Sequence, residues 1–124
     1  ISSGAATGGL HRQIGYAASK AGLLGMTKTV TLEHARDGIT CNAILPGLIG
    51  TELANMMPEE IRDRARAMIP ARRMGEMEEV GHLIAFLASD KAAYINGAEI
   101  RLDGGMGLNP GTLGSRREIK EMDK

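Results

Sequence analysis

Three residues near the start of the chain have the types and spacing needed for proton transfer. Ser3 precedes Tyr16 by thirteen positions, and Tyr16 precedes Lys20 by four. In a helix, residues four apart lie on one face, about 6 Å apart along the axis, so the phenol and the ammonium would be presented together. A nearby cation favours the ionised form of a phenol, which makes tyrosine usable as a general acid or base. A serine hydroxyl from the end of a preceding strand would reach the same point and hydrogen-bond a substrate oxygen.

The elements around these residues are expected to alternate between strand and helix. The opening "ISSG" is typical of a strand end that runs into a glycine-rich loop. A proline-free stretch from about 15 to 36, rich in small and apolar residues, predicts a largely buried helix that ends at Gly38. The apolar, β-branched run 39–45 predicts a strand buried on both faces, closed by Pro46. Helix followed by buried strand indicates an α/β layer fold.

The second half of the chain continues the same alternation. The segment 47–75 is rich in Met, Arg and Pro, and a helix is predicted from about Met57. A substrate lid and a connecting surface helix are equally good interpretations of this segment. The stretch 76–90 predicts an amphipathic helix with acidic residues in its first turn, and 98–102 predicts a strand. These elements predict a parallel sheet, and 106–124 is expected to form a tail.

The composition of the chain argues against several classes of function. The 124 residues suffice for one domain or part of one, and fifteen basic residues balance fifteen acidic ones, which gives no electrostatic case for nucleic acid or an anionic membrane. Cys41 lies in an apolar run and is expected to be a buried thiol in a reducing compartment, so we expect a cytoplasmic protein without a membrane span. No metal site is expected, because the histidines share no ligand spacing: His11, His34 and His82.

Several linked motifs identify a family resemblance. The stretches "ISSGAATGG", "YAASKAGLLGMTKTV", "GITCNAILPGLIGTEL" and "NGAEIRLDGG" resemble, in order and spacing, the C-terminal half of short-chain dehydrogenases/reductases, and 3-oxoacyl-acyl-carrier-protein reductases are the nearest analogy. The resemblance covers about residues 1–106. It implies hydride transfer between a nicotinamide and a carbonyl or secondary alcohol.

The resemblance also implies roles for individual residues. Tyr16 would exchange the proton, Ser3 would orient the substrate oxygen, and Lys20 would bind the nicotinamide ribose and favour the ionised form of Tyr16. Ser2 is the neighbouring candidate for the serine, but the thirteen-residue interval favours Ser3. The expected cofactor-binding residues are Tyr16, Lys20, Pro46, Gly47, Ile49 and Thr51.

The sequence also departs from the family pattern. The family's glycine-rich diphosphate-binding turn, its selector between NAD and NADP and its catalytic asparagine all lie in an N-terminal half that we expect to be absent from 1–105, a partial Rossmann-type half-domain. The cofactor is therefore NAD or NADP, with incomplete binding by this chain alone. Its partners are expected to be a small carbonyl or alcohol substrate and either further copies of itself or a separate N-terminal half. Two function classes stay open, namely a part of an oxidoreductase and a catalytically inactive oligomerisation or interaction module.

Overall fold

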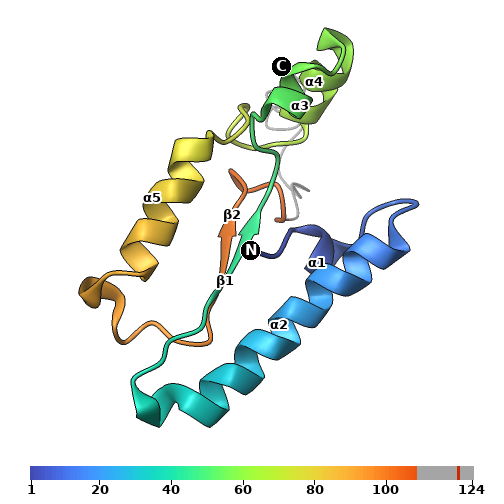
Figure 1. Ribbon diagram of the computed structural model, residues 1–124. Helices are drawn as coiled ribbons and strands as arrows, with labels where there is room; N and C mark the ends of the chain where they lie inside the picture. The colour runs from blue at the N-terminus through green and yellow to red at the C-terminus, as the bar shows by residue number, and fades with distance from the viewer. Residues whose placement is uncertain (109–119, 121–124) are drawn as a thin grey trace.

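The computed structural model describes residues 1–108 and 120 of the chain. Within these residues, helices surround a small parallel sheet (Figure 1). The elements, in chain order, are α1 (Ala5–Gly8), α2 (Ile14–His34), the 3-10 turn η1 (Ala35–Asp37), β1 (Ala43–Pro46), α3 (Glu52–Asn55), α4 (Glu59–Ala67), α5 (Met77–Leu87), the 3-10 turn η2 (Asp90–Ala92) and β2 (Glu99–Leu102).

The sheet is parallel, as the sequence predicted. β1 pairs with β2 in a register that places Ala43 opposite Glu99 and Pro46 opposite Leu102. The first residues of the chain run along the other side of β1: the Ser2 N–H donates to the Ile44 carbonyl at 2.8 Å, and the Gly4 N–H donates to the Pro46 carbonyl at 3.3 Å. The segment before α1, β1 and β2 therefore end at one edge of the sheet.

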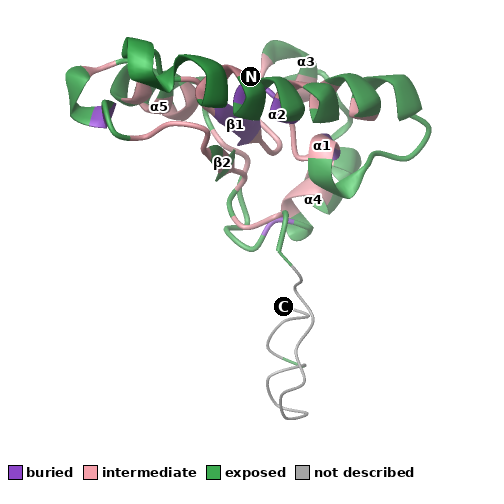
Figure 2. Ribbon diagram, turned by 90° about the horizontal axis from the view of Figure 1, so that it is seen from below, coloured by how far each residue is buried: buried purple, intermediate pink, exposed green. Residues whose placement is uncertain are grey.

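The core is centred on β1. Its residues Ala43, Ile44 and Leu45 are buried, because α2 lies on one side of the sheet and α5 on the other (Figures 1 and 2). Leu24 of α2 packs against Ala43 and Leu45. This arrangement explains why the strand is apolar on both faces, whereas the exposure of β2 alternates along the strand.

Helix α2 begins and ends close to the predicted positions, but the prediction that it is largely buried is wrong. Gly38 ends the helical region with a positive φ of 77°, as expected for a C-terminal glycine. Within α2 only Leu24 and Thr27 are buried, and its outer face is exposed (Figure 2). A Cβ on Gly22 or Gly25 would have nothing within 4 Å, so no described element uses the close approach that these glycines permit.

Strand β1 starts later than predicted, at Ala43 instead of Ile39. Side-chain amides replace strand pairing before that point: Asn96 Oδ1 accepts from the Cys41 N–H at 2.8 Å, and Asn42 Oδ1 accepts from the Ala98 N–H at 3.0 Å. Cys41 is half-buried there, which corrects the expectation of a buried thiol. The second strand likewise starts one residue later than predicted.

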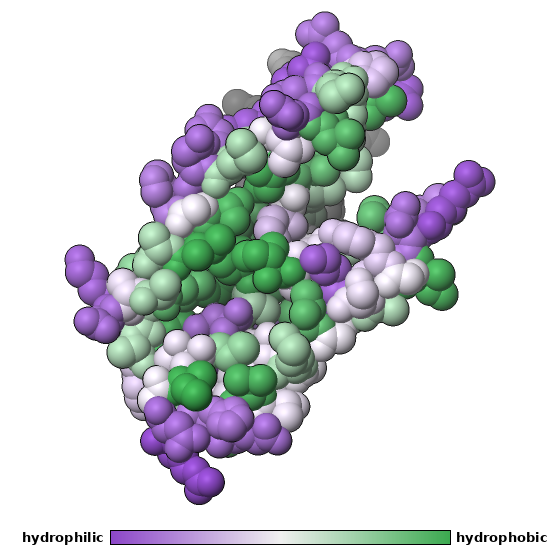
Figure 3. All heavy atoms as spheres, viewed as in Figure 1, coloured by the Kyte–Doolittle hydropathy of each residue, from purple (hydrophilic) through white to green (hydrophobic). Residues whose placement is uncertain are grey.

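The remaining elements differ from prediction mainly in detail. The expected glycine-rich loop after Ser3 forms the short helix α1. The segment 47–75 holds two helices, α3 and α4, in place of one. Helix α5 starts at a reciprocal capping box between Glu76 and Glu79 and is amphipathic as expected. Apolar side chains gather in the hollow between α5 and α2 (Figure 3).

Two expectations concern the chain as a whole. Of the expected tail 106–124, only 106–108 and 120 belong to the described residues. Across the described part of the chain, no helix has both the length and the apolar character that a membrane crossing requires.

Candidate functional site

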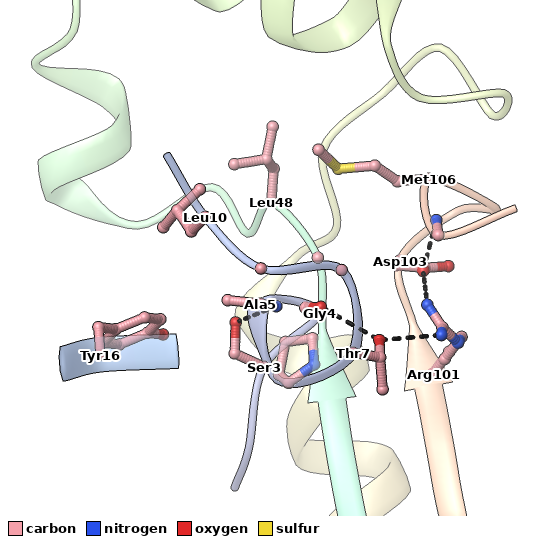
Figure 4. A pocket seen from close by; sticks show the side chains of 15 residues that line it. Ser3, Gly4, Ala5, Thr7, Leu10, Tyr16, Leu48, Arg101, Asp103 and Met106 are labelled. Atoms are coloured by element: carbon pink, nitrogen blue, oxygen red, sulfur yellow. Dashed lines mark hydrogen bonds and ion pairs between the residues drawn. The ribbon is translucent and has the colours of Figure 1, made fainter. Parts of the chain in front are cut away.

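A pocket of about 510 Å³ opens at the edge where the three parallel segments end (Figure 4). In open parallel sheets the carboxyl ends of the strands are where ligands bind. The pocket wall combines apolar side chains with three hydroxyls, from Ser3, Thr7 and Tyr16, and one charged pair, Arg101 and Asp103. The pocket thus has the mixture of apolar surface and a few polar groups that is typical of small-molecule sites.

Ser3 lines the pocket, and its neighbour Ser2 does not. The Ser3 hydroxyl accepts a hydrogen bond from the Ala5 N–H at 3.2 Å, so its own proton is free to be donated to a ligand. Ser2 is 4% exposed, and its hydroxyl donates to the Lys20 carbonyl at 2.8 Å. Ser2 therefore ties the first segment to α2, and Ser3 is the serine that lines the pocket.

Tyr16 and Lys20 lie together in the first turns of α2. The Lys20 ammonium is 5.7 Å from the centre of the Tyr16 ring. It also donates to the Ile1 carbonyl at 3.1 Å, which fixes the lysine between α2 and the first segment. Tyr16 lines the pocket and is 43% exposed, whereas Lys20 stands behind it and is not part of the pocket wall. The structure thus brings Ser3 and Tyr16 to one cavity with Lys20 beside the phenol.

The four residues expected along the cofactor divide into two pairs. Pro46 and Gly47 line the pocket at the end of β1. Ile49 and Thr51 are not part of its wall: Ile49 forms an isolated parallel bridge with Gly75, and the Thr51 hydroxyl caps α3 by accepting from the Ala54 N–H at 3.2 Å.

Sequence reasoning missed the far end of the pocket. Arg101 Nη2 donates to Thr7 Oγ1 at 3.0 Å, and Arg101 Nη1 lies 3.9 Å from Asp103 Oδ2 (Figure 4). The signal was present, because Asp103 follows a predicted strand and parallel strands end at one edge. The pairing of Arg101 with Thr7 joins residues 94 positions apart and has no signature in the sequence. Other wall residues missed are Leu10, Leu48 and Met106.

A second, tighter ion pair lines a neighbouring cavity. Arg73 Nη2 contacts Glu79 Oε1 at 2.7 Å, and Arg73 Nη1 contacts Glu79 Oε2 at 2.8 Å. These hydrogen bonds, with a further one from the Glu76 N–H, lower the pKa of Glu79 from 4.5 to about 2. This pair shares a smaller cavity of about 270 Å³ with Arg101 and Asp103. Among the described residues, no three His, Cys, Asp or Glu side chains are grouped as a metal ion would require.

Comparison with known proteins gives a consistent picture. Residues 1–107 match a family model described as enoyl-(acyl carrier protein) reductase. The chain is 47% identical over 94 residues to the (3R)-3-hydroxyacyl-CoA dehydrogenase of Mus musculus, a match that covers 76% of this chain and 36% of that protein. It is 45% identical over 100 residues to the 3-oxoacyl-[acyl-carrier-protein] reductase MabA of Mycobacterium avium, covering 81% of this chain and 39% of that one. The chain thus spans well under half the length of these curated relatives.

A solved structure shares the fold. A short chain dehydrogenase family protein from Francisella tularensis superposes with a TM-score of 0.81 at 26% sequence identity, over 87% of this chain and 49% of that one. The arrangement of sheet and helices is therefore that of a Rossmann-type α/β fold.

Proposed function

The chain belongs to the short-chain dehydrogenase/reductase family, and we propose that it supplies the catalytic Ser-Tyr-Lys side of an NAD(P)-dependent oxidoreductase that interconverts a carbonyl and a secondary alcohol. The observation that carries the proposal is the shared pocket of Ser3 and Tyr16, with the Lys20 ammonium 5.7 Å from the phenol ring. The names of the relatives, which refer to hydroxyacyl and oxoacyl groups, support a substrate of that kind.

Each of the three residues has a distinct task in this reaction. The Ser3 hydroxyl donates a hydrogen bond to the substrate oxygen and holds it near the phenol. Tyr16 Oη gives a proton to that oxygen during reduction and takes it back during oxidation. Lys20 is held in place by the Ile1 carbonyl, so that its ammonium stays beside the Tyr16 ring.

The residues present fit one part of a nicotinamide cofactor. Pro46 and Gly47 line the same pocket as Tyr16, Gly47 adds no side chain to its wall, and Lys20 has further N–H groups for ribose hydroxyls. When bound, the nicotinamide supplies or accepts the hydride. Ile49 and Thr51 do not line the pocket, so they would contact only a part of the cofactor that extends beyond it. We propose that a separate segment holds the adenosine and the diphosphate of the cofactor. That segment would also set the choice between NAD and NADP.

The test is turnover by the chain in its native assembly. Native mass spectrometry, with NADH and NADPH titrated separately, identifies what assembles with the chain and whether nucleotide binds. Oxidation of NAD(P)H is then followed with an acetoacetyl thioester as substrate. Tyr16→Phe should reduce turnover by at least about a hundredfold, because general acid–base catalysis contributes factors of that size. Tyr94→Phe is the matched control, since Tyr94 is fully exposed and lies outside the pocket. Equal turnover in Tyr16→Phe and Tyr94→Phe would contradict the proposal.

A second candidate function rests on the uncovered surface of α2. Ile14 and Leu32 are 88% and 86% exposed, and open space lies over Gly22 and Gly25. Such a face suits an oligomerisation or interaction module. A homo-oligomer that binds neither nucleotide in the experiment above would favour this function.

A further inference from the structure

A single arginine supplies the positive charge on the wall of the Ser3–Tyr16 pocket. Among the described residues that line this pocket, Arg101 is the one cation, and its side chain is 38% exposed. It comes from the end of β2, whereas Ser3 and Tyr16 come from the first segment and α2. The proposed reaction gives it no role.

The guanidinium is fixed in position by its neighbours. Nη2 donates to Thr7 Oγ1 at 3.0 Å, and Thr7 in turn donates to the Gly4 carbonyl at 3.2 Å. The Gly107 backbone passes so close that a Cβ there would overlap Arg101 Nη1. Because the arginine is held in this way, a ligand would lose little side-chain entropy on binding to it.

Asp103 does not neutralise the guanidinium through close hydrogen bonds. Its Oδ1 accepts from the Gly105 N–H and its Oδ2 from the Gly107 N–H, each at 2.9 Å, while Arg101 Nη1 is 3.9 Å away from Oδ2. Asp103 is thus occupied in closing the turn after β2. The guanidinium has five N–H donors, and one of them is used by the bond to Thr7 within the described part of the chain.

Thr7 connects the two polar ends of the pocket through its hydrogen bonds. Thr7 donates to the carbonyl of Gly4, the residue next to Ser3, at 3.2 Å, and accepts from Arg101 Nη2 at 3.0 Å. Figure 4 shows Tyr16 at one end, Ser3 and Thr7 between, and Arg101 with Asp103 at the other end. Apolar side chains, including Leu48 and Met106, line the wall beside this path.

We propose that Arg101 binds the carboxylate of a short oxo or hydroxy acid whose carbonyl or hydroxyl group lies between Ser3 and Tyr16. A planar guanidinium matches a carboxylate through two parallel hydrogen bonds. Because Thr7 links Arg101 to Gly4, the residue next to Ser3, we expect a short acid. This inference rests on the proposed function for the carbonyl end of the ligand. At the other end it places a free carboxylate in place of the thioester, and that end stands on Arg101 alone.

The experiment measures binding, so it does not depend on turnover or on nucleotide. The isotope-labelled chain is titrated with 4-oxopentanoate, with its methyl ester and with inorganic phosphate, and amide and arginine N–H shifts are followed by NMR. The acid should shift the Arg101 side-chain and Thr7 signals and bind at least tenfold more tightly than the ester. Arg101→Met should remove that difference, Arg101→Lys should retain part of it, and Arg36→Met, an exposed arginine outside both cavities, should leave it unchanged.

The outcomes separate the two proposals. Equal affinity for acid and ester, or Arg101→Met binding the acid as tightly as the unaltered chain, overturns the carboxylate site. Phosphate binding as tight as that of the acid shows an unspecific anion site and also overturns it. Should Arg101→Met fail to fold, the acid–ester comparison on the unaltered chain decides. Arg101-dependent binding of the acid together with full turnover in Tyr16→Phe would uphold this site and refute the proposed reaction.

Discussion

Replacing Gly47 by alanine should destabilise the protein because of one backbone contact. A Cβ added to Gly47 would lie 2.7 Å from Asp103 Cβ and 2.9 Å from Asp103 Cα. Neither atom belongs to the far end of a flexible side chain, so the ends of the two strands must separate. The same movement lengthens the hydrogen bond from the Gly47 N–H to the Leu102 carbonyl, which is 2.9 Å long. Gly47 is not among the glycines with positive φ, so the effect is steric and not conformational.

The magnitude follows from two opposing terms. Overpacking a well-packed site costs about 1–3 kcal/mol. Reduced freedom of the unfolded chain returns about 0.4–1 kcal/mol when glycine becomes alanine. The net loss for Gly47→Ala therefore lies between about 0 and 2.6 kcal/mol, with a central value of about 1.3 kcal/mol. Near the unfolding midpoint each kcal/mol corresponds to a shift of about 3–5 °C for a chain of this length.

The matched control is Gly22→Ala, which should change stability in the opposite direction. A Cβ on Gly22 meets nothing within 4 Å, and the residue lies inside α2. Alanine there should stabilise the chain by about 0.5–1 kcal/mol. Both variants are compared by urea unfolding, followed by far-ultraviolet circular dichroism. A Gly47→Ala midpoint at or above that of the unaltered chain would refute the steric argument, and a destabilised Gly22→Ala would show that another surface covers this face of α2.

Two further predictions concern polar contacts. The Arg73–Glu79 pair lowers the pKa of Glu79 to about 2. The stabilisation of the folded protein by this pair is therefore complete above about pH 4.5 and is lost as the pH falls toward 2. In Arg73→Gln, a carboxyl NMR titration should show the pKa of Glu79 returning toward 4.5, and an unchanged pKa would refute the role of Arg73. In Asn96→Ala, Oδ1 no longer accepts from the Cys41 N–H and the Thr31 hydroxyl, and Nδ2 no longer donates to the Ile39 carbonyl. The substitution should lower the free energy of unfolding by about 1–3 kcal/mol. Urea unfolding with no loss of stability would show that water replaces these bonds.

Much of the candidate site could be predicted from local sequence. The four-residue step from Tyr16 to Lys20 places both side chains on one helix face wherever the helix packs, and Gly38 adopts the positive φ that ends it. The apolar run before Pro46 indicated a buried parallel strand, and β1 is one. Helical periodicity, capping and β-branched runs act within a few residues, so the sequence by itself determines them.

Tertiary structure decided what depends on contacts between distant segments. Thr7 meets Arg101, and Gly47 meets Asp103, only because the three parallel segments end at one edge of the sheet. The later start of β1 also depends on a remote side chain, since Asn96 takes the Cys41 N–H. The exposure of α2 is set by which surfaces pack on it, and its own composition, which indicated burial, does not contain that information.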